Sequence, residues 1–296
     1  MTKTIRKRSL ITALVIVTSS LISFAQEFKK NAIFWEVTGN GLEKPSYIMA
    51  ILKFIPESEY ILPPIALEKI NACRILSTET LLDHRSKHEL NKAAHLGHHE
   101  SLKDYLSKEE FNSLEDLFKD RFGIGKLKFE MVYSKFKPVM LSTTMTRLAL
   151  KEDIKFYELD LINIANKNGM IMLGLEPVER EVEALERFSL EDQINALKHT
   201  ITHFDQQVSD YHKVVEAYTA GDLHTTLEYT LHPVENNRMF RTYFIERRNS
   251  EWLPKMVGYM KQAPTFFAIG ASHLADEKGL LSLLEQRGYT IKPMKL

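Results

Sequence analysis

Residues 265–273 read TFFAIGASH, and this stretch decides the fold. Thr265 to Gly270 has the apolar and aromatic composition of a buried strand. Gly270-Ala271-Ser272 is a run of small residues that lets another group approach the backbone closely, and His273 follows at the strand end. Because α/β proteins place ligands and reacting groups at such strand ends, the stretch predicts an α/β sheet with a functional histidine. A histidine that only packs against the turn would give the same pattern.

The rest of the chain alternates short apolar runs with long amphipathic stretches. Turn residues Gly39-Asn40-Gly41 join the first two expected strands. Strands are expected at 33–37, 47–52, 74–80, 170–175 and 289–294. Helices are expected at 65–72, 104–122, 130–150, 156–168, 178–220, 239–261 and 276–287. No Pro/Gly/Ser-rich linker divides the chain, so we expect one helix-rich α/β domain around a small mixed sheet, spanning residues 26–296.

The first 25 residues have the pattern of a cleavable secretory signal peptide. Four basic residues lie within the first eight, and residues 10–24 (LITALVIVTSSLISF) carry no charge. That run is shorter than the roughly 20 apolar residues needed to span a bilayer. Ser23-Phe24-Ala25 places small residues where a signal peptidase reads them. We therefore expect an extracytoplasmic protein, periplasmic or secreted; an uncleaved N-terminal anchor is the alternative.

Composition narrows the function classes. The chain is 44% hydrophobic and 26% charged, with 39 basic and 39 acidic residues. Removal of the first 25 residues takes away only basic ones, so nucleic-acid binding, which needs a basic face, is not expected. No second apolar run reaches membrane-spanning length. Cys73 is the sole cysteine, which excludes an intramolecular disulfide and indicates a buried, inert thiol.

The Gly-x-x-His element and the following residues 274–289 (LADEKGLLSLLEQRGY) resemble the C-terminal signature of the TraB/GumN family. The resemblance covers essentially the whole chain after residue 25. In chain order, the matching segments are Phe34-Trp35-Glu36-Val37, Gly41-Leu42, Lys44-Pro45-Ser46-Tyr47, Thr78-Glu79-Thr80, Asp160 with Ala165, Gly174-Leu175-Glu176, and Arg248-Asn249 with Trp252. That family is related to the Tiki metalloproteases and, more distantly, to ChaN- and erythromycin-esterase-like proteins. The resemblance implies a ChaN/erythromycin-esterase-like fold.

The resemblance also implies a metal site. In the Tiki-type mechanism two Gly-x-x-His motifs and an acidic residue hold a divalent metal, here Zn, Mn or Co. The second motif is intact as Gly270-x-x-His273, and Glu79 stands at the acidic position. The first reads Ala50-Ile51-Leu52-Lys53. An ammonium has no lone pair to give a metal, so fewer than the usual three protein ligands of a catalytic zinc remain.

Several other residues are candidates for this site. Lys53 could pair with Glu79 or Glu176 and leave a metal-free site for an anion. Arg248 could pair with Glu36, Glu79 or Glu176 as a structural partner, or capture a substrate carboxylate. Asn249 and Gly270 complete the expected substrate-binding set. Separately, His95, His98 and His99 have the i, i+3, i+4 spacing of a helical metal chelate.

Two functions of different class follow. The first is a metal-dependent hydrolase of peptides that uses His273 and Glu79. The second, favoured by the ligand count, is a catalytically degenerate member that binds a peptide or a small anionic ligand. The sequence does not define the substrate or the oligomeric state.

Overall fold

The protein is built on a six-stranded mixed sheet with strand order β6-β4-β7-β2-β1-β8. The computed structural model describes residues 32–81, 83–151, 153–231 and 238–295. Four neighbouring strands run parallel and two more complete the sheet as an antiparallel edge. The parallel strands are β6 (Ile171–Glu176), β4 (Ile75–Thr80), β7 (Thr265–Gly270) and β2 (Ser46–Ile51); the edge is β1 (Phe34–Gly39) and β8 (Tyr289–Pro293).

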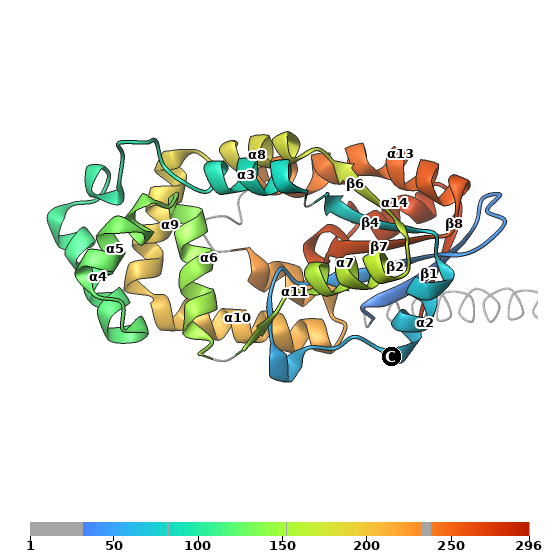
Figure 1. Cartoon of the computed structure of the whole chain (residues 1–296), viewed down its shortest axis with the longest axis horizontal. Helices are drawn as coiled ribbons and strands as arrows, with labels where there is room; N and C mark the ends of the chain where they lie inside the picture. Colours follow the sequence, from blue (N-terminus) through green and yellow to red (C-terminus); the bar gives the residue numbers. More distant parts are fainter. Residues whose placement is uncertain (1–31, 82, 152, 232–237, 296) are drawn as a thin grey trace, which may run out of the picture.

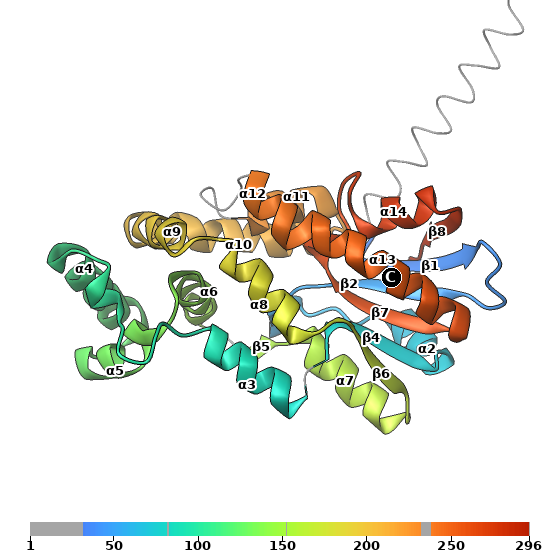
Figure 2. The same cartoon turned by 90° about the horizontal axis from the view of Figure 1, so that it is seen from above.

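Helices cover both faces of this sheet. Figure 2 shows α13 (Arg247–Gln262) and α14 (Leu280–Gln286) on one face, and α2 (Pro64–Ala72) and α7 (Tyr157–Lys167) on the other. The inner strands β2 and β7 are buried along almost their whole length, because both of their faces are covered by helices. This arrangement explains why TFFAIG is apolar throughout rather than alternating.

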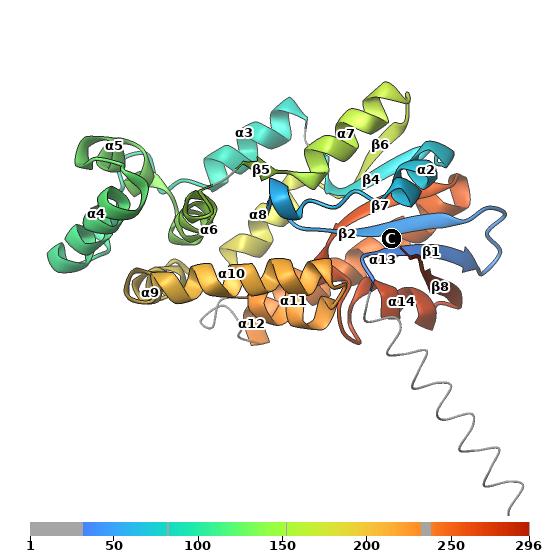
Figure 3. The ribbon, with the colours of Figure 1, turned by 90° about the horizontal axis from the view of Figure 1, so that it is seen from below.

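A helical lobe lies beyond the carboxyl ends of the parallel strands (Figure 1). It has its own apolar core, which includes Phe111, Phe118 and Phe129. The helices of the lobe are α4 (Lys108–Phe122), α5 (Lys126–Met131), α6 (Pro138–Ala149) and α9 (Leu190–Thr202). The elements between lobe and sheet are α3 (His84–Ala93), α8 (Val178–Glu186), α10 (Phe204–Thr219), α11 (Leu223–Thr230) and the short strands β3 (Ile55–Pro56) and β5 (Ile154–Lys155), as seen in Figure 3.

The expected fold class is confirmed: the chain is a helix-rich α/β domain around a mixed sheet. The predicted strand 265–270 matches β7 residue for residue, and the predicted final strand is an edge strand. Cys73 is buried, and burial raises the pKa of its thiol to about 12. Within the described ranges, no helix is long and apolar enough to cross a membrane. The predicted signal peptide and its cleavage site lie outside the described residues.

Several of the predicted helix boundaries are wrong, including that of the helix expected from residue 104, which begins at Lys108. The long helix expected at 178–220 is three helices, because Ser189 caps a new helix start and His203 leaves helical geometry. The helix expected at 130–150 begins at Pro138, since proline is tolerated in the first turn but not in a helix interior. The last helix begins at Leu280 rather than Asp276, because Asp276 adopts the left-handed conformation with φ of 66°.

The expected histidine chelate is also wrong in its geometry. The helix α3 ends at Ala93, so the spacing of His95, His98 and His99 is not that of one helix face. His95 stacks on Phe136 and its Nδ1 lies 2.6 Å from the carbonyl oxygen of Asn91. Its ring is therefore engaged in packing and a backbone contact.

Candidate functional site

The sheet brings four strand ends together at the edge that faces the helical lobe. Because β6, β4, β7 and β2 are parallel neighbours, their carboxyl ends lie side by side. Glu176 ends β6, Glu79 is the penultimate residue of β4, and Gly270 ends β7 just before His273. Lys53 follows β2 by two residues. The two related motifs, Ala50-x-x-Lys53 and Gly270-x-x-His273, thus lie at adjacent strand ends.

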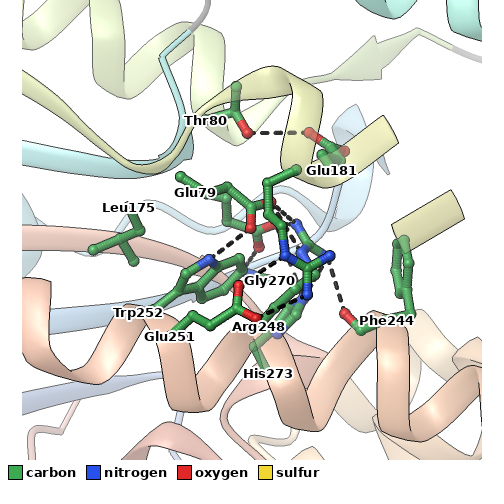
Figure 4. Close-up of polar contacts among 12 residues, drawn as sticks. Glu79, Thr80, Leu175, Glu181, Phe244, Arg248, Glu251, Trp252, Gly270 and His273 are labelled. Carbon is green, nitrogen blue, oxygen red and sulfur yellow. Dashed lines mark hydrogen bonds and ion pairs between the residues drawn. The ribbon is translucent and has the colours of Figure 1, made fainter. Parts of the chain in front are cut away.

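The helix α13 supplies the centre of the cluster, Arg248, whose side chain is 1% exposed (Figure 4). All five N–H groups of its guanidinium have acceptors. Nε and Nη2 donate to Glu176 Oε1 at 2.9 and 2.7 Å, and Nη2 also donates to Glu79 Oε2 at 3.3 Å. Nη1 donates to the Phe244 carbonyl at 3.1 Å and to His273 Nε2 at 3.3 Å. Arg248 is therefore a structural partner of both carboxylates, with no donor left over for a substrate.

Glu176 is equally saturated. Its Oε2 accepts a 2.8 Å hydrogen bond from the indole of Trp252, and its Oε1 is held by Arg248. Burial raises the pKa of Glu176 above its ordinary value, while the hydrogen bonds from Arg248 and Trp252 oppose that rise. The guanidinium carbon lies 4.8 and 4.7 Å from the ring centroids of Phe244 and Trp252, which adds cation–π attraction. This inner part of the cluster is closed to ligands.

The hydrogen bonds of His273 define its tautomer. Asn249 donates through Nδ2 to the carbonyl oxygens of His273 and Lys278, so its Oδ1 is the atom that faces His273 Nδ1, at 2.7 Å. Nδ1 must then carry the proton. Because a guanidinium can only donate hydrogen bonds, Nε2 is the acceptor in its contact with Arg248. Burial, with the charges of Arg248 and Lys53, lowers the pKa of His273 well below its ordinary value. The ring is neutral, with its Nε2 lone pair aimed at the cluster.

Glu79 is fixed from the other side by the backbone of β7. Gly270 N–H donates to Glu79 Oε1 at 2.8 Å. A Cβ at position 270 would lie 2.7 Å from the same oxygen, which explains the glycine: a side chain there would push Glu79 away. Glu79 keeps 19% of its side chain exposed, so one face of the carboxylate is open.

The outer rim of the site is formed by Lys53 and three glutamates. The Lys53 side chain is 73% exposed and its Nζ lies 3.4 Å from Glu181 Oε1. The carboxylates of Glu181 and Glu79 raise the pKa of Lys53. Thr80 donates to the second oxygen of Glu181 at 3.1 Å. Burial and the neighbouring Glu79 raise the pKa of Glu158 to about 7.

The residues present do not fit the divalent metal implied by the family. His273 Nε2 and Glu79 Oε2 lie 4.0 Å apart, but Arg248 Nη1 is 3.3 Å from the first and Arg248 Nη2 is 3.3 Å from the second. Arg248 thus occupies the place between the two expected ligands with a positive charge, and Lys53 adds a second cation nearby. In the part of the chain that the structure describes, no group of three or more His, Cys, Asp or Glu is placed to hold a metal ion.

The sequence-predicted site residues are brought together with one exception. Glu79, Glu176, Arg248, Asn249, Gly270 and His273 form one connected network, with Lys53 at its rim. Glu36 pairs in register with Tyr47 near the amino end of β2, so its expected pairing with Arg248 is wrong. The partner of Lys53 is Glu181 rather than the expected Glu79 or Glu176.

Sequence reasoning missed Glu158 and Glu181. Both lie in the first turn of a helix that borders the sheet edge, Glu158 in α7 and Glu181 in α8. Glu181 follows Glu176 by five residues, and a carboxylate on the helix directly after a motif strand was the available signal. Glu158 has no comparable signal, because its helix α7 comes before the strand β6 in the chain rather than directly after a strand that carries a motif residue.

The sequence model of the TraB/PrgY/gumN family matches residues 33–293. The chain therefore belongs to this family, whose match spans the whole sheet and the helical lobe. No curated protein and no solved structure gave a significant match.

Proposed function

We propose that this family member is a metal-independent binding protein for peptides, and that the outer rim of Lys53, Glu79, Glu158 and Glu181 is its ligand site. Lys53 would hold the carboxylate of the peptide, and the glutamates would hold its amino or amide N–H groups. The balance of charge supports a peptide over a simple anion. Three carboxylates, those of Glu79, Glu176 and Glu181, are paired with two cations, Arg248 and Lys53, and Glu158 adds a fourth carboxyl group. A ligand that carries both signs matches this rim best.

The observation that carries the proposal is the saturated guanidinium of Arg248. Its donors satisfy Glu79, Glu176 and His273 at once, so the expected metal ligands are already neutralised within the protein. In this view the chain is a degenerate relative of the Tiki metalloproteases, in which Lys53 stands where a metal-binding histidine is expected.

Affinity selection from a random tetrapeptide mixture in the presence of EDTA tests this proposal. Peptides with a free carboxyl terminus should be retained, and the same mixture with amidated termini should be retained much less. Lys53→Ala should weaken the capture of free-carboxylate peptides by at least about tenfold, the loss of one charge-assisted contact. Lys92→Ala, which removes an exposed lysine from α3, is the matched control. Equal capture by Lys53→Ala, or capture that EDTA abolishes, would contradict the proposal.

The alternative is a metal-dependent peptide hydrolase that uses His273 and Glu79. One observation favours it: Asn249 Oδ1 lies 2.7 Å from His273 Nδ1 and so leaves Nε2 unprotonated, the arrangement expected behind a metal ligand. This function requires Arg248 to leave its present position. The metal titration described at the end of the Discussion separates the two functions.

We further propose that the protein works outside the cytoplasm after removal of residues 1–25. The charge and hydropathy of that segment support export. Sequencing the amino terminus of the protein recovered from the extracytoplasmic fraction should give Gln26 as the first residue. Recovery of the intact chain from the membrane fraction would support the uncleaved anchor instead.

A further inference from the structure

The far end of the helical lobe carries an exposed apolar patch formed by Leu127, Met131 and Val132. These side chains are 71%, 68% and 45% exposed. They account for three of the eight large apolar side chains that are exposed among the described residues, and they lie within six positions of one another. The other five each lie on a different element outside α5. Single exposed apolar residues are ordinary on a protein surface, but a cluster at a tip is not.

The geometry of α5 explains why this patch faces outward. Phe129 is fully buried and packs on Phe111 and Phe118 of α4, with ring centroids 5.5 and 4.7 Å away. At 100° per residue, Leu127 and Met131 lie two positions to either side of Phe129 and so point almost directly away from it. Phe129 therefore fixes α5 to the lobe while Leu127 and Met131 project into solvent. In Figure 3, α4 and α5 lie at the end of the molecule opposite the β1–β2 hairpin.

The charge around the patch is basic. Residues 123–137 contain Lys126, Lys128, Lys135 and Lys137 against the single acid Glu130, which gives a net charge of +3 by subtraction in a chain whose total is zero. Glu130 is paired with Lys103 at 2.6 Å, but Lys126 is paired with Glu115 at 3.1 Å and Lys137 with Glu186 at 3.8 Å. Lys128 and Lys135 are therefore the lysines of this segment that have no carboxylate partner among the described residues. Lys128, beside Leu127, forms no ion pair within the described ranges.

We propose that this tip docks on an anionic lipid bilayer, with Leu127, Met131 and Val132 entering the headgroup boundary and the lysines contacting acidic headgroups. Apolar side chains that project from a basic surface are the combination that binds such membranes. Lys128, which has no carboxylate partner among the described residues, lies beside the projecting apolar side chains and favours an anionic membrane as the occupant. A stable protein interface also needs about 1,200 Å² or more, which two side chains on a six-residue helix and a third directly after it do not supply. The proposal is independent of the ligand site at the sheet edge.

Tryptophan fluorescence of the full chain tests the proposal. In Met131→Trp, the new indole is the probe, since native Trp35 and Trp252 are fully buried. Vesicles of phosphatidylglycerol should shift its emission to the blue, and brominated acyl chains should quench it. Leu67→Trp, on α2 at the other end of the molecule, is the control and should show neither effect. Any contribution of the apolar residues 10–24 is the same in both proteins.

A second pair of variants measures the strength of the contact. Leu127→Ser with Met131→Ser should lower partitioning onto phosphatidylglycerol vesicles by at least about tenfold, and Leu67→Ser with Leu159→Ser should not. Phosphatidylcholine vesicles should give little binding in either case. Absence of quenching, or equal quenching at positions 67 and 131, would overturn the proposal. A blue shift that depends on protein concentration without vesicles would assign the patch to self-association and would overturn it as well.

Discussion

At the residue scale, Arg248 decides what the cluster can do. Its guanidinium is buried with two carboxylates, Glu176 and Glu79, and a neutral imidazole, His273. A buried charge is tolerated only when its hydrogen bonds are satisfied, and here every N–H has an acceptor. Because all of these N–H groups are used within the protein, Arg248 has no donor left for a ligand. The reactive-looking residues of the motif are thereby tied into a structural network.

The first prediction concerns the strength of that network. Glu176→Gln and Arg248→Met should each lower the free energy of unfolding by about 3 to 5 kcal/mol, because each leaves a buried charge without its partner. The double variant should lose less than the sum of the two. The more exposed pair Arg180–Glu251, in which two guanidinium nitrogens contact the two carboxylate oxygens, is the control and should show a coupling below about 1 kcal/mol. Additive losses at Arg248 and Glu176, measured by urea denaturation, would refute the network.

The second prediction concerns the protonation of His273. Nuclear magnetic resonance should find its ring neutral, protonated on Nδ1, well below pH 6.5. His224 is the internal comparison, because its hydrogen bond to Asp276, at 2.8 Å, raises its pKa above the ordinary value. As pH falls, His224 should become charged first. If His273 titrates before His224, the assigned tautomer and its buried contact with Arg248 are wrong.

The third prediction concerns pH and Glu158. The pKa of this carboxyl is about 7 in the folded chain and about 4.5 when unfolded, so folding takes up a proton between these values. Ionising Glu158 therefore costs more free energy in the folded chain than in the unfolded chain, and the protein loses stability as pH rises from about 5 to 8. Glu158→Gln removes this penalty, so its stability advantage over wild type should grow by about 1 to 3 kcal/mol across that range. The exposed Glu191→Gln should show no such trend; a flat difference for Glu158→Gln would count against the raised pKa.

Most residues of the site could be predicted from short sequence motifs, but the position of Glu158 and that of Glu36 could not. Motif residues such as Gly270 and His273 lie at strand ends, where sequence alone indicates proximity. Glu158 depends on the angle at which α7 crosses the sheet edge, which has no local sequence signal. The prediction for Glu36 was wrong for a related reason. The strand β1 runs antiparallel to β2, and Glu36 pairs with Tyr47 near the amino end of β2, at the opposite end of the sheet from the site.

At the scale of elements, strands were predictable because each is a short apolar run between breakers. Helix boundaries were harder. The apolar period continues through 178–220 although the backbone breaks near Ser189 and His203, so periodicity merged three helices into one. The capping residues at the helix ends show where each helix begins and stops, which the apolar period does not. The helix α4 begins at a complete capping box of Ser107 and Glu110 and ends at Gly123, whose φ is 67°.

The fourth prediction tests that start signal. Ser107→Ala should lower the free energy of unfolding by about 1 kcal/mol, since it leaves the Glu110 N–H at the helix start without its acceptor. Ser113→Ala, at an exposed position inside the same helix, should be neutral or slightly stabilising. Chemical denaturation of both variants makes the comparison. An equal effect of the two would mean that the cap does not contribute.

At the scale of the whole molecule, two apolar cores define a sheet body and a helical lobe, and the candidate site lies at the sheet edge that faces the lobe. The sequence predicted the body well but not the second core, because no helix was expected at α5 and α9 was merged into the helix expected at 178–220. In the two proposals, the lobe faces the sheet edge that carries the rim of Lys53 and the glutamates, and its far end carries the basic apolar patch.

The central claim is that Arg248 makes this site independent of metal, and calorimetric titration of Zn²⁺, Mn²⁺ and Co²⁺ into the metal-stripped protein tests it most directly. We expect no stoichiometric binding that depends on His273, so wild type and His273→Ala should behave alike. Elemental analysis of the protein as purified should agree. One tightly bound ion per chain that is lost in His273→Ala would contradict the claim and establish the metal-dependent alternative.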